Sequence, residues 1–314
     1  AFCEGLNCVV KNMEEAKVAE MIAVALVFEN MHQKIWKQAE KSGKADKMRK
    51  AIRMIRTISH IDKKIQKRTM RLFKEVHAGL GGHVRLMVAG AAPINPAVIN
   101  DFNAMGITML QGYGMTECSP IIALNPDWCA RAAAAGLPLP ESEVRIFEPD
   151  ENGIGEIICK SQSVMLGYYK DEEETAKVLR DGWLYTGDYG YFDKDGYLYI
   201  TGRKKNVIVT KNGKNIFPEE VEFYLNSSPY ISEVVVTGEA EETSGESIVW
   251  ASIFPDRDAI LEQKGTLSDE EVRSLLKAEI DRINEQMPFY KRVKRFRIRD
   301  TEFDKTTTRK IKRW

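Results

Sequence analysis

The chain has 314 residues, 43% of them hydrophobic, which is typical of a soluble globular protein large enough for two domains. Its 46 Lys and Arg residues balance 46 Asp and Glu residues, so no net charge favours binding to nucleic acid. The longest early apolar run, MIAVALVF (residues 21–28), is too short to span a membrane and has no charged leader. We therefore expect a cytoplasmic protein, with peripheral association at a membrane left open.

Residues 12–79 are mostly helix formers, and Ile52, Ile55, Ile58 and Ile61 recur on one helical face, so this region is expected to be helical. The stretch from His83 to residue 107 then predicts a strand, a glycine-containing turn and a helix that begins near Asn95 with Pro96 at its first position. Residues 108–117 predict a second strand that runs into a loop. Both loops should leave the same edge of an α/β sheet, where such sheets bind ligands.

After Pro126 the sequence changes to short β-rich pieces separated by turns, with DKDG (193–196) as a hairpin signal. A helix is expected to open at Pro218, followed by strands around 232–240 and 247–254, a helix around 268–286 and a last strand around 293–300. This α+β pattern is large enough for a small separate domain. We place the boundary after Arg203, giving domains 1–203 and 204–314, with a β-rich subdomain over about 126–203.

The five cysteines are odd in number and have no metal-ligand spacing, which favours a reducing compartment. We expect buried free thiols. The cysteines are Cys3, Cys8, Cys118, Cys129 and Cys159.

Four segments stand in a characteristic order: AGAAP (89–93), QGYGMTE (111–117), YTGD to YLYITGR (185–203) and FDKTTTRKIKR (303–313). Together they resemble the adenylate-forming (ANL) superfamily, and most closely the bacterial long-chain fatty-acyl-CoA ligases. The resemblance covers essentially the whole chain. It implies an α/β fold: the C-terminal part of a large multi-layer adenylation domain with a β-rich subdomain, followed by a small mobile α+β domain.

The resemblance also implies how an acyl-adenylate would be held. Tyr113 would offer a flat face to adenine, and small residues would lie against the other side. Thr116 would bond the α-phosphate, and Glu117 would hold Mg²⁺, which prefers carboxylate and phosphate oxygens. The small residues against adenine are Gly90, Ala91 and Ala92, and those that leave room for the acyl carboxylate are Gly112 and Gly114. An ordinary turn at 111–117 and a core role for Tyr113 are the simpler alternatives.

Asp188 resembles the family's ribose-hydroxyl ligand, since a carboxylate can accept from both hydroxyls. Arg203 is similar to the arginine that also contacts the ribose, and Lys205 falls at the family's hinge position. Gly213 resembles the glycine beside the pantetheine tunnel for CoA, and it would form an Asn-Gly turn in either case. A turn aspartate at 188 and a plain surface lysine at 205 are the alternatives.

Lys310 matches the near-terminal catalytic lysine that would bridge the acyl carboxylate and the α-phosphate. Arg309 precedes it where the family has glycine, a departure that affects the loop because glycine permits conformations that arginine avoids. The alternative is a basic tail for anionic partners, because Lys291 to Arg313 is rich in Lys and Arg.

Two further departures concern missing features. Ala133 and Ala134 stand where relatives have Gly-Ser, so the serine hydroxyl is absent. The Ser/Thr/Gly-rich phosphate loop, which the family carries upstream of AGAAP, is not present in these 314 residues, so we expect little activity from this chain alone.

The first hypothesis is therefore an AMP-forming ligase that uses ATP, Mg²⁺, CoA and a fatty acid. A non-catalytic nucleotide- or acyl-binding fragment is the second, favoured by the missing phosphate loop. An adenylation module that loads a carrier protein is the third, although Val84 stands where a carrier's pantetheine-bearing serine would be.

Overall fold

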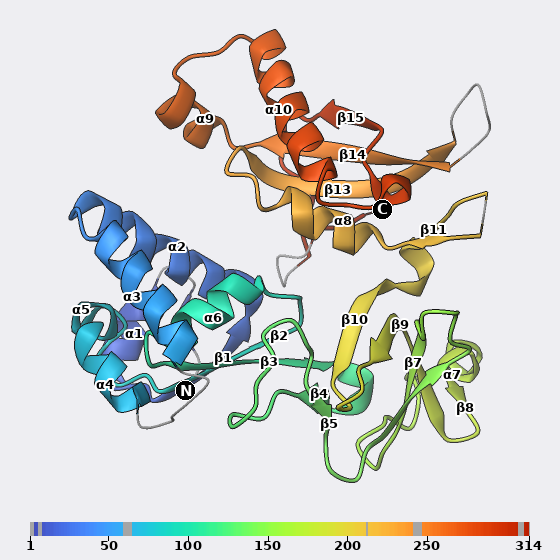
Figure 1. The fold of residues 1–314 in the computed structure, drawn as a ribbon. Coiled ribbons are helices and arrows are strands. Elements are labelled where there is room, and N and C mark those ends of the chain that lie inside the picture. The colour runs from blue at the N-terminus through green and yellow to red at the C-terminus, as the bar shows by residue number, and fades with distance from the viewer. Residues whose placement is uncertain are drawn as a thin grey trace. The chain divides into compact units, whose positions relative to one another are not determined.

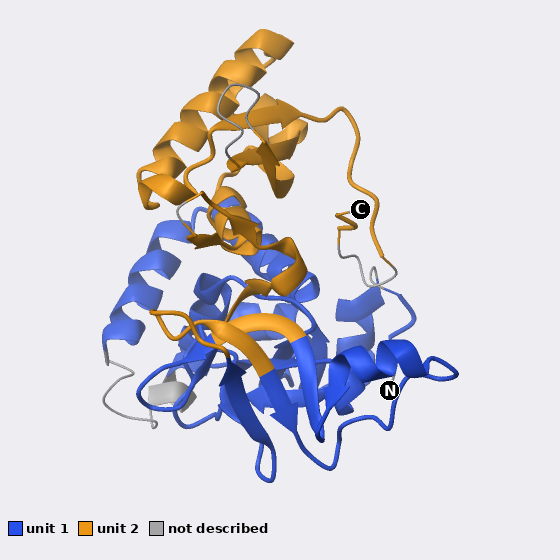
Figure 2. Cartoon of the chain, turned by 90° about the vertical axis from the view of Figure 1, so that its right-hand side faces the viewer, with its two compact units in different colours: residues 1–147, 158–186, 191–199 blue, residues 148–157, 187–190, 200–314 orange. Residues whose placement is uncertain are grey.

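The structure, a computed structural model, describes residues 3–5, 8–58, 65–211, 213–240, 247–306 and 311–313. The chain forms two compact units (Figure 2). Unit 1 contains residues 1–147, 158–186 and 191–199, and unit 2 contains residues 148–157, 187–190 and 200–314.

Unit 1 contains a five-stranded sheet in the order β1-β2-β3-β4-β5 (Figure 1). The first three strands are parallel, with Ala23 beside Ala89 and Ala89 beside Gln111, whereas β4 and β5 are antiparallel additions. Because β2 and β3 are parallel neighbours, the loops that follow them leave the same edge, as expected. The strands are β1 (Glu20–Val24), β2 (Leu86–Gly90), β3 (Thr108–Gly114), β4 (Ile121–Leu124) and β5 (Leu137–Pro138).

Helices α2, α3 and α6 contact one another, and α2 and α6 also contact the parallel strands (Figure 1). The core between them includes the fully buried Phe28, Met87 and Phe102. Helix α6 begins as expected, with Pro96 in its first turn and the Asn95 side chain accepting from the Ala97 N–H. The helices are α1 (Val9–Glu15), α2 (Ala25–Lys41), α3 (Ala45–Ile58), α4 (Ile65–Leu72), α5 (Lys74–Gly79) and α6 (Pro96–Ala104).

The expectation of an all-helical N-terminal region was wrong at β1. The run 21–28 is divided between β1, which pairs in parallel with β2, and the first turn of α2. The periodicity of a short apolar run does not distinguish a strand from a buried helix. Residues 20–24 form a strand because their backbone pairs with β2. Ile52 and Ile55 are buried in the core as predicted, and Ile61 lies outside the described residues.

A second sheet has the order β10-β9-β7-β6, with β8 pairing β9. The DKDG turn predicted between the aromatic-rich runs is present, since the N–H of Gly196 bonds to the carbonyl of Asp193. The short helix α7 (Glu172–Val178) was not expected. Its N-terminus is capped by Asp171, which accepts from the N–H of Glu174. The strands are β6 (Glu143–Phe147), β7 (Gly155–Lys160), β8 (Leu179–Arg180), β9 (Trp183–Phe192) and β10 (Leu198–Arg203).

The C-terminal part of unit 2 is the predicted α+β arrangement. Strand β14 lies between antiparallel β13 and parallel β15, and α8 packs on β13 and contacts α10 (Figure 1). Helix α10 starts with a capping box between Ser268 and Glu271. Helix α9 and the short strands β11 and β12 were not expected. The elements are β11 (Ile208–Val209), β12 (Asn215–Ile216), α8 (Pro218–Leu225), β13 (Ile231–Ala240), β14 (Ser247–Pro255), α9 (Arg257–Lys264), α10 (Asp269–Asn284) and β15 (Arg295–Ile298).

The cysteines are free, but the expectation that all are buried was wrong. Cys118 and Cys159 are buried, whereas Cys3 and Cys129 are exposed and Cys8 is half-buried. Scattered cysteines carry no periodicity, so only the fold decides which of them are covered. Within the described part of the chain, no helix is both long and apolar enough to cross a membrane.

Candidate functional site

The small residues after β2 lie beside the end of β3. Ala89 pairs with Gln111, and the next residues along the two strands are Gly90 and Gly112. The loop after β2 is tied to β3 because the N–H of Ile94 donates to the side-chain oxygen of Gln111 over 3.2 Å. A Cβ added at Gly90 would meet no atom within 4 Å, so open space faces this position.

Ala91 and Tyr113 occupy different environments. Ala91 is exposed and has a φ of 67°, an uncommon conformation for a residue with a side chain. Tyr113 is half-buried and packs against the cluster formed by Cys118, Ile122, Cys159 and Leu184. Tyr113 therefore contributes to the core of unit 1, and its contact with adenine stays a prediction.

Gly114 is required by the chain itself. A Cβ at Gly114 would overlap the carbonyl oxygen of Pro120, whereas one at Gly112 would lie 3.0 Å from the Cδ1 atom of Leu124. Close backbone approach after β3 is thus the structural reason for the second glycine. It lets the chain turn directly into the short helical turn η2 (Thr116–Cys118).

Within η2, Thr116 is exposed and Glu117 is half-buried. The hydroxyl of Tyr168 donates to Oε1 of Glu117 over 2.9 Å, and the N–H of Met165 donates to the Glu117 carbonyl over 2.8 Å. Burial, followed by the hydrogen bond to the negative carboxylate, raises the pKa of Tyr168 to about 12. Glu117 is therefore held by a donor that stays protonated at neutral pH.

Unit 2 brings Asp188 and Arg203 together. Their ion pair joins Nε of Arg203 to Oδ1 of Asp188 over 2.8 Å, and the Asp188 side chain is only 7% exposed. The next residue, Lys204, forms a 2.6 Å ion pair with the buried carboxylate of Glu156. Lys205 follows in the exposed turn η3 (Lys204–Asn206). Neither Glu156 nor Lys204 was predicted from the sequence to have a role.

Gly213 and Lys310 complete the expected set. Gly213 is exposed, has a φ of 71°, and its N–H closes a turn onto the carbonyl of Thr210. Lys310 and Arg309 lie outside the described residues. Beyond them, Arg313 pairs with Glu222 and Glu219 of α8.

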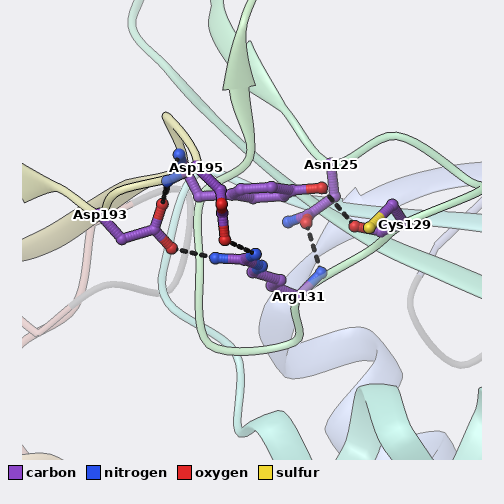
Figure 3. A network of polar contacts seen from close by, with 6 residues as sticks. Asn125, Cys129, Arg131, Asp193 and Asp195 are labelled. Atoms are coloured by element: carbon purple, nitrogen blue, oxygen red, sulfur yellow. Dashed lines mark hydrogen bonds and ion pairs between the residues drawn. The ribbon is translucent and has the colours of Figure 1, made fainter.

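A polar network in unit 1 supports the segment that contains Ala133 and Ala134 (Figure 3). The buried Asn125 side chain donates to the carbonyls of Gln111 and Ala134 and accepts from the N–H of Arg131. The Arg131 guanidinium binds Asp193 and Asp195 of the β9–β10 turn. These bonds fix the segment to the strand that carries Gly112.

The network was missed because its members are far apart in sequence. Arg131 also stacks on the Tyr197 ring at 4.2 Å, and the Tyr197 hydroxyl donates to the carbonyl of Cys129. The available signals were single residues: an arginine in an alanine-rich stretch and two aspartates in a turn. Neither signal indicates a partner.

The geometry defines a class of protein. Two parallel strands end in small residues, and the second is followed by a threonine and an oriented carboxylate, a placement typical of ligand sites in α/β enzymes. Residues 7–169 match the model of the AMP-binding enzyme family, and residues 205–313 match that of the AMP-binding enzyme C-terminal domain. The chain therefore belongs to the AMP-binding enzyme family, within the adenylate-forming superfamily.

Curated relatives are ligases by name. The chain is 31% identical over 257 residues to the long-chain-fatty-acid–CoA ligase FadD15 of Mycobacterium bovis, covering 77% of this chain and 42% of that protein. It is 38% identical over 172 residues to a long-chain-fatty-acid–CoA ligase of Yersinia pestis, covering 52% of this chain and 30% of that protein. The matched segments thus cover less than half the length of these relatives.

Solved structures agree with the fold. The o-succinylbenzoate CoA synthetase of Bacillus subtilis, in complex with its acyl-adenylate intermediate, matches with a TM-score of 0.69 at 22% identity. An ATP-bound RpMatB-BxBclM chimera matches with a TM-score of 0.68 at 25% identity. Each match covers 98% of this chain and 52% of the solved one. The expected fold class, the C-terminal part of an adenylation domain, is confirmed.

Proposed function

We propose that this chain is the C-terminal part of an AMP-forming acyl-CoA synthetase that acts on a fatty acid. The first half-reaction joins the fatty carboxylate to the α-phosphate of ATP and releases pyrophosphate, and in the second the CoA thiol displaces AMP. The observation that carries the proposal is the β3–η2 stretch, in which Tyr113, Thr116 and an oriented Glu117 follow one another at the strand end. The names of the relatives support a fatty acid as substrate.

In unit 1, residues that follow β2 and β3 are proposed to contact different parts of the nucleotide. Gly90, Ala91 and Ala92 lie on one side of adenine and Tyr113 on the other. Thr116 bonds the α-phosphate, and Gly112 and Gly114 leave the backbone accessible to the acyl carboxylate.

Glu117 suits a Mg²⁺ ion because a hard cation prefers carboxylate oxygen. Tyr168 holds Oε1, so Oε2 would be the oxygen of Glu117 available to the cation. Within the described residues there is no group of three or more His, Cys, Asp or Glu side chains able to bind a metal, so the remaining ligands would come from the nucleotide and water. When bound, Mg²⁺ would neutralise phosphate charge.

In unit 2, Asp188 would accept from the ribose hydroxyls, and Arg203 would hold Asp188 and contact the same ribose. The proposed domain boundary lies between residues 203 and 204, with a β-rich subdomain over about 126–203. Lys205 is the proposed hinge, since an exposed side chain can change its surroundings at little cost. Gly213 is proposed to border the CoA tunnel.

Lys310 is the proposed catalytic lysine of the first half-reaction. Its ammonium group would offset the negative charge that builds as the carboxylate approaches the α-phosphate. Arginine at position 309, where the family has glycine, allows fewer backbone conformations directly before Lys310.

The 314 residues contain no phosphate loop, so we propose that this chain binds AMP but has negligible ligase activity. A nucleotide-binding protein without catalysis is the second candidate, favoured by the same feature. The two are separated by assaying the complete enzyme, defined as a protein that contains these 314 residues and a phosphate loop. Thioester formation with release of AMP supports the ligase, and ADP as the stoichiometric product contradicts it.

The nucleotide site is tested on the chain itself by calorimetric titration with AMP and, as a control, GMP. Loss of stacking in Tyr113→Ala should weaken AMP binding by about tenfold or more. Trp128→Ala, which removes an exposed aromatic ring of the same unit outside the proposed site, is the matched control. Equal binding of AMP and GMP, or unchanged AMP affinity in Tyr113→Ala, contradicts the proposed site.

A further inference from the structure

Unit 2 contains two buried carboxylates that pair with two consecutive cations. Asp188 pairs with Arg203 and Glu156 pairs with Lys204, and both acidic side chains are 7% exposed. The segments that carry them, 148–157, 187–190 and the chain from residue 200, all belong to unit 2 (Figure 2). The proposed function uses only the first pair, so the buried charge of Glu156 needs an explanation.

Glu156 makes a second contact that leads toward Asp188. Its Oε2 atom accepts from Lys204, while Oε1 accepts from the backbone N–H of Gly187 over 3.2 Å. Gly187 has a φ of 68°, a conformation that favours glycine, and Asp188 is the next residue. A side chain that holds this amide therefore holds the backbone from which the Asp188 carboxylate projects.

The cations differ from the acids in exposure. The Lys204 and Arg203 side chains are 54% and 46% exposed, so each reaches from solvent to a carboxylate fixed in the interior. The acids are thus the fixed side of both pairs. Lys204 is held by its pair with Glu156, and the next residue, Lys205, is exposed.

We propose that Glu156 is a positioning residue for the ribose-binding carboxylate: through the Gly187 amide it sets the orientation of Asp188, and through Lys204 it fixes the chain up to Lys205. The inference rests on the proposed nucleotide site, in which Asp188 receives the ribose hydroxyls. A carboxylate is required at 156 because it accepts from Gly187 and Lys204 at once. An amide has one acceptor oxygen and presents an N–H group to the other donor.

The test is the ratio of the dissociation constants of 2′-deoxy-AMP and 3′-deoxy-AMP to that of AMP, measured by calorimetry on this chain. In the wild type, loss of one hydroxyl bonded to a carboxylate should weaken binding roughly 10- to 100-fold. Glu156→Gln should lower both ratios at least about fivefold, because a displaced Asp188 no longer distinguishes the hydroxyls. Glu220→Gln is the matched control, since Glu220 forms a 2.7 Å pair with Lys291 in the same unit. It should leave the ratios unchanged.

Two further variants separate the possible outcomes. Asp188→Asn should abolish the discrimination, and if it does not, the proposed ribose role of Asp188 is wrong. If Asp188→Asn abolishes it while Glu156→Gln keeps it, the positioning role of Glu156 is wrong. A purely structural role would weaken AMP and its deoxy forms equally. Lys204→Met should keep the ratios within about twofold because the Gly187 contact remains, and a collapse of the ratios would overturn the route through Gly187.

A further test uses only the wild-type chain, so it does not depend on whether a variant folds. The Gly187 amide should be protected from hydrogen exchange in the folded chain because it donates to a buried carboxylate. Exchange of this amide at the rate of an unstructured peptide would overturn the proposal.

Discussion

The Tyr168 hydroxyl donates to Oε1 of Glu117 over 2.9 Å, which joins the turn after β3 to a residue 51 positions later in the chain. Because the pKa of Tyr168 is raised to about 12, this donor is retained throughout the range in which an enzyme of this family would be assayed. The contact makes the orientation of Glu117 testable separately from its charge.

Glu117→Gln in the complete enzyme should raise the Mg²⁺ concentration needed for half-maximal adenylation about tenfold or more, because the amide keeps the shape but loses the charge. Tyr168→Phe should give a smaller shift, since the carboxylate remains and only its orientation is relaxed. The measurement is exchange of labelled pyrophosphate into ATP as Mg²⁺ is varied. Unchanged turnover of Glu117→Gln at limiting Mg²⁺ would remove Glu117 from the metal site.

Lys310→Ala should lower the adenylation rate by about 10² to 10³, the typical cost of removing one preorganised contact to developing charge. Attack of CoA on a preformed acyl-adenylate should proceed at nearly the normal rate, because the lysine acts only in the first half-reaction. Both half-reactions are measured in the complete enzyme beside Lys312→Ala, whose side chain lies in the same basic segment. Small and similar effects of the two substitutions would support a basic tail instead.

Glu222 should make unit 2 less stable as the pH rises from about 4.5 to about 7. Burial raises the pKa of Glu222 to about 7, against the opposing effects of its ion pair with Arg313 and of the Val236 N–H that donates to it. In this window the folded state keeps a proton that the unfolded state has released, so the free energy of unfolding falls by up to about 1.4 kcal/mol per pH unit. Above about pH 7 the loss is complete.

Urea denaturation of the wild type and Glu222→Gln at pH 5, 6, 7 and 8 isolates this contribution. The uncharged amide removes the titration, so the difference between the two proteins should change with pH in this window and then level off. Glu279→Gln, which removes a carboxylate paired with Arg282 on α10, is the control. Parallel stability curves for the wild type and Glu222→Gln would contradict the prediction.

The cysteine thiols should react at different rates, according to how exposed each one is. In the folded chain at pH 8, Cys3 and Cys129 should react with a disulfide reagent such as DTNB first, and Cys8 more slowly. Cys118 and Cys159 should react only after unfolding, because both are buried and burial raises the pKa of Cys159 to about 12. Cys129→Ser should remove one rapidly reacting thiol. Rapid reaction of all five cysteines would contradict the described packing of unit 1.

Local sequence patterns predicted the elements whose signals lie in neighbouring residues. Asn95 and Pro96 marked the start of α6, the run 268–286 predicted the helix found as α10, and DKDG formed the expected turn. The same patterns missed β1, whose strand character depends on the edge of β2, which lies more than sixty residues later in the chain. Short helices such as α7 and α9 were missed because few residues carry their signal.

The sequence by itself determined the family and the order of its motifs, and it predicted which side chains bind a nucleotide, because these depend on residue types and their spacing along the chain. Only the tertiary structure showed that Tyr168 orients Glu117, that Asn125 ties the alanine-rich segment to β3, and that Glu156 holds the amide before Asp188. These contacts join residues 14 to 51 positions apart, and a single sequence contains no signal for the partner of a buried polar group. The partner is decided by which strands and turns become neighbours, since a buried donor or acceptor must be satisfied where it lies.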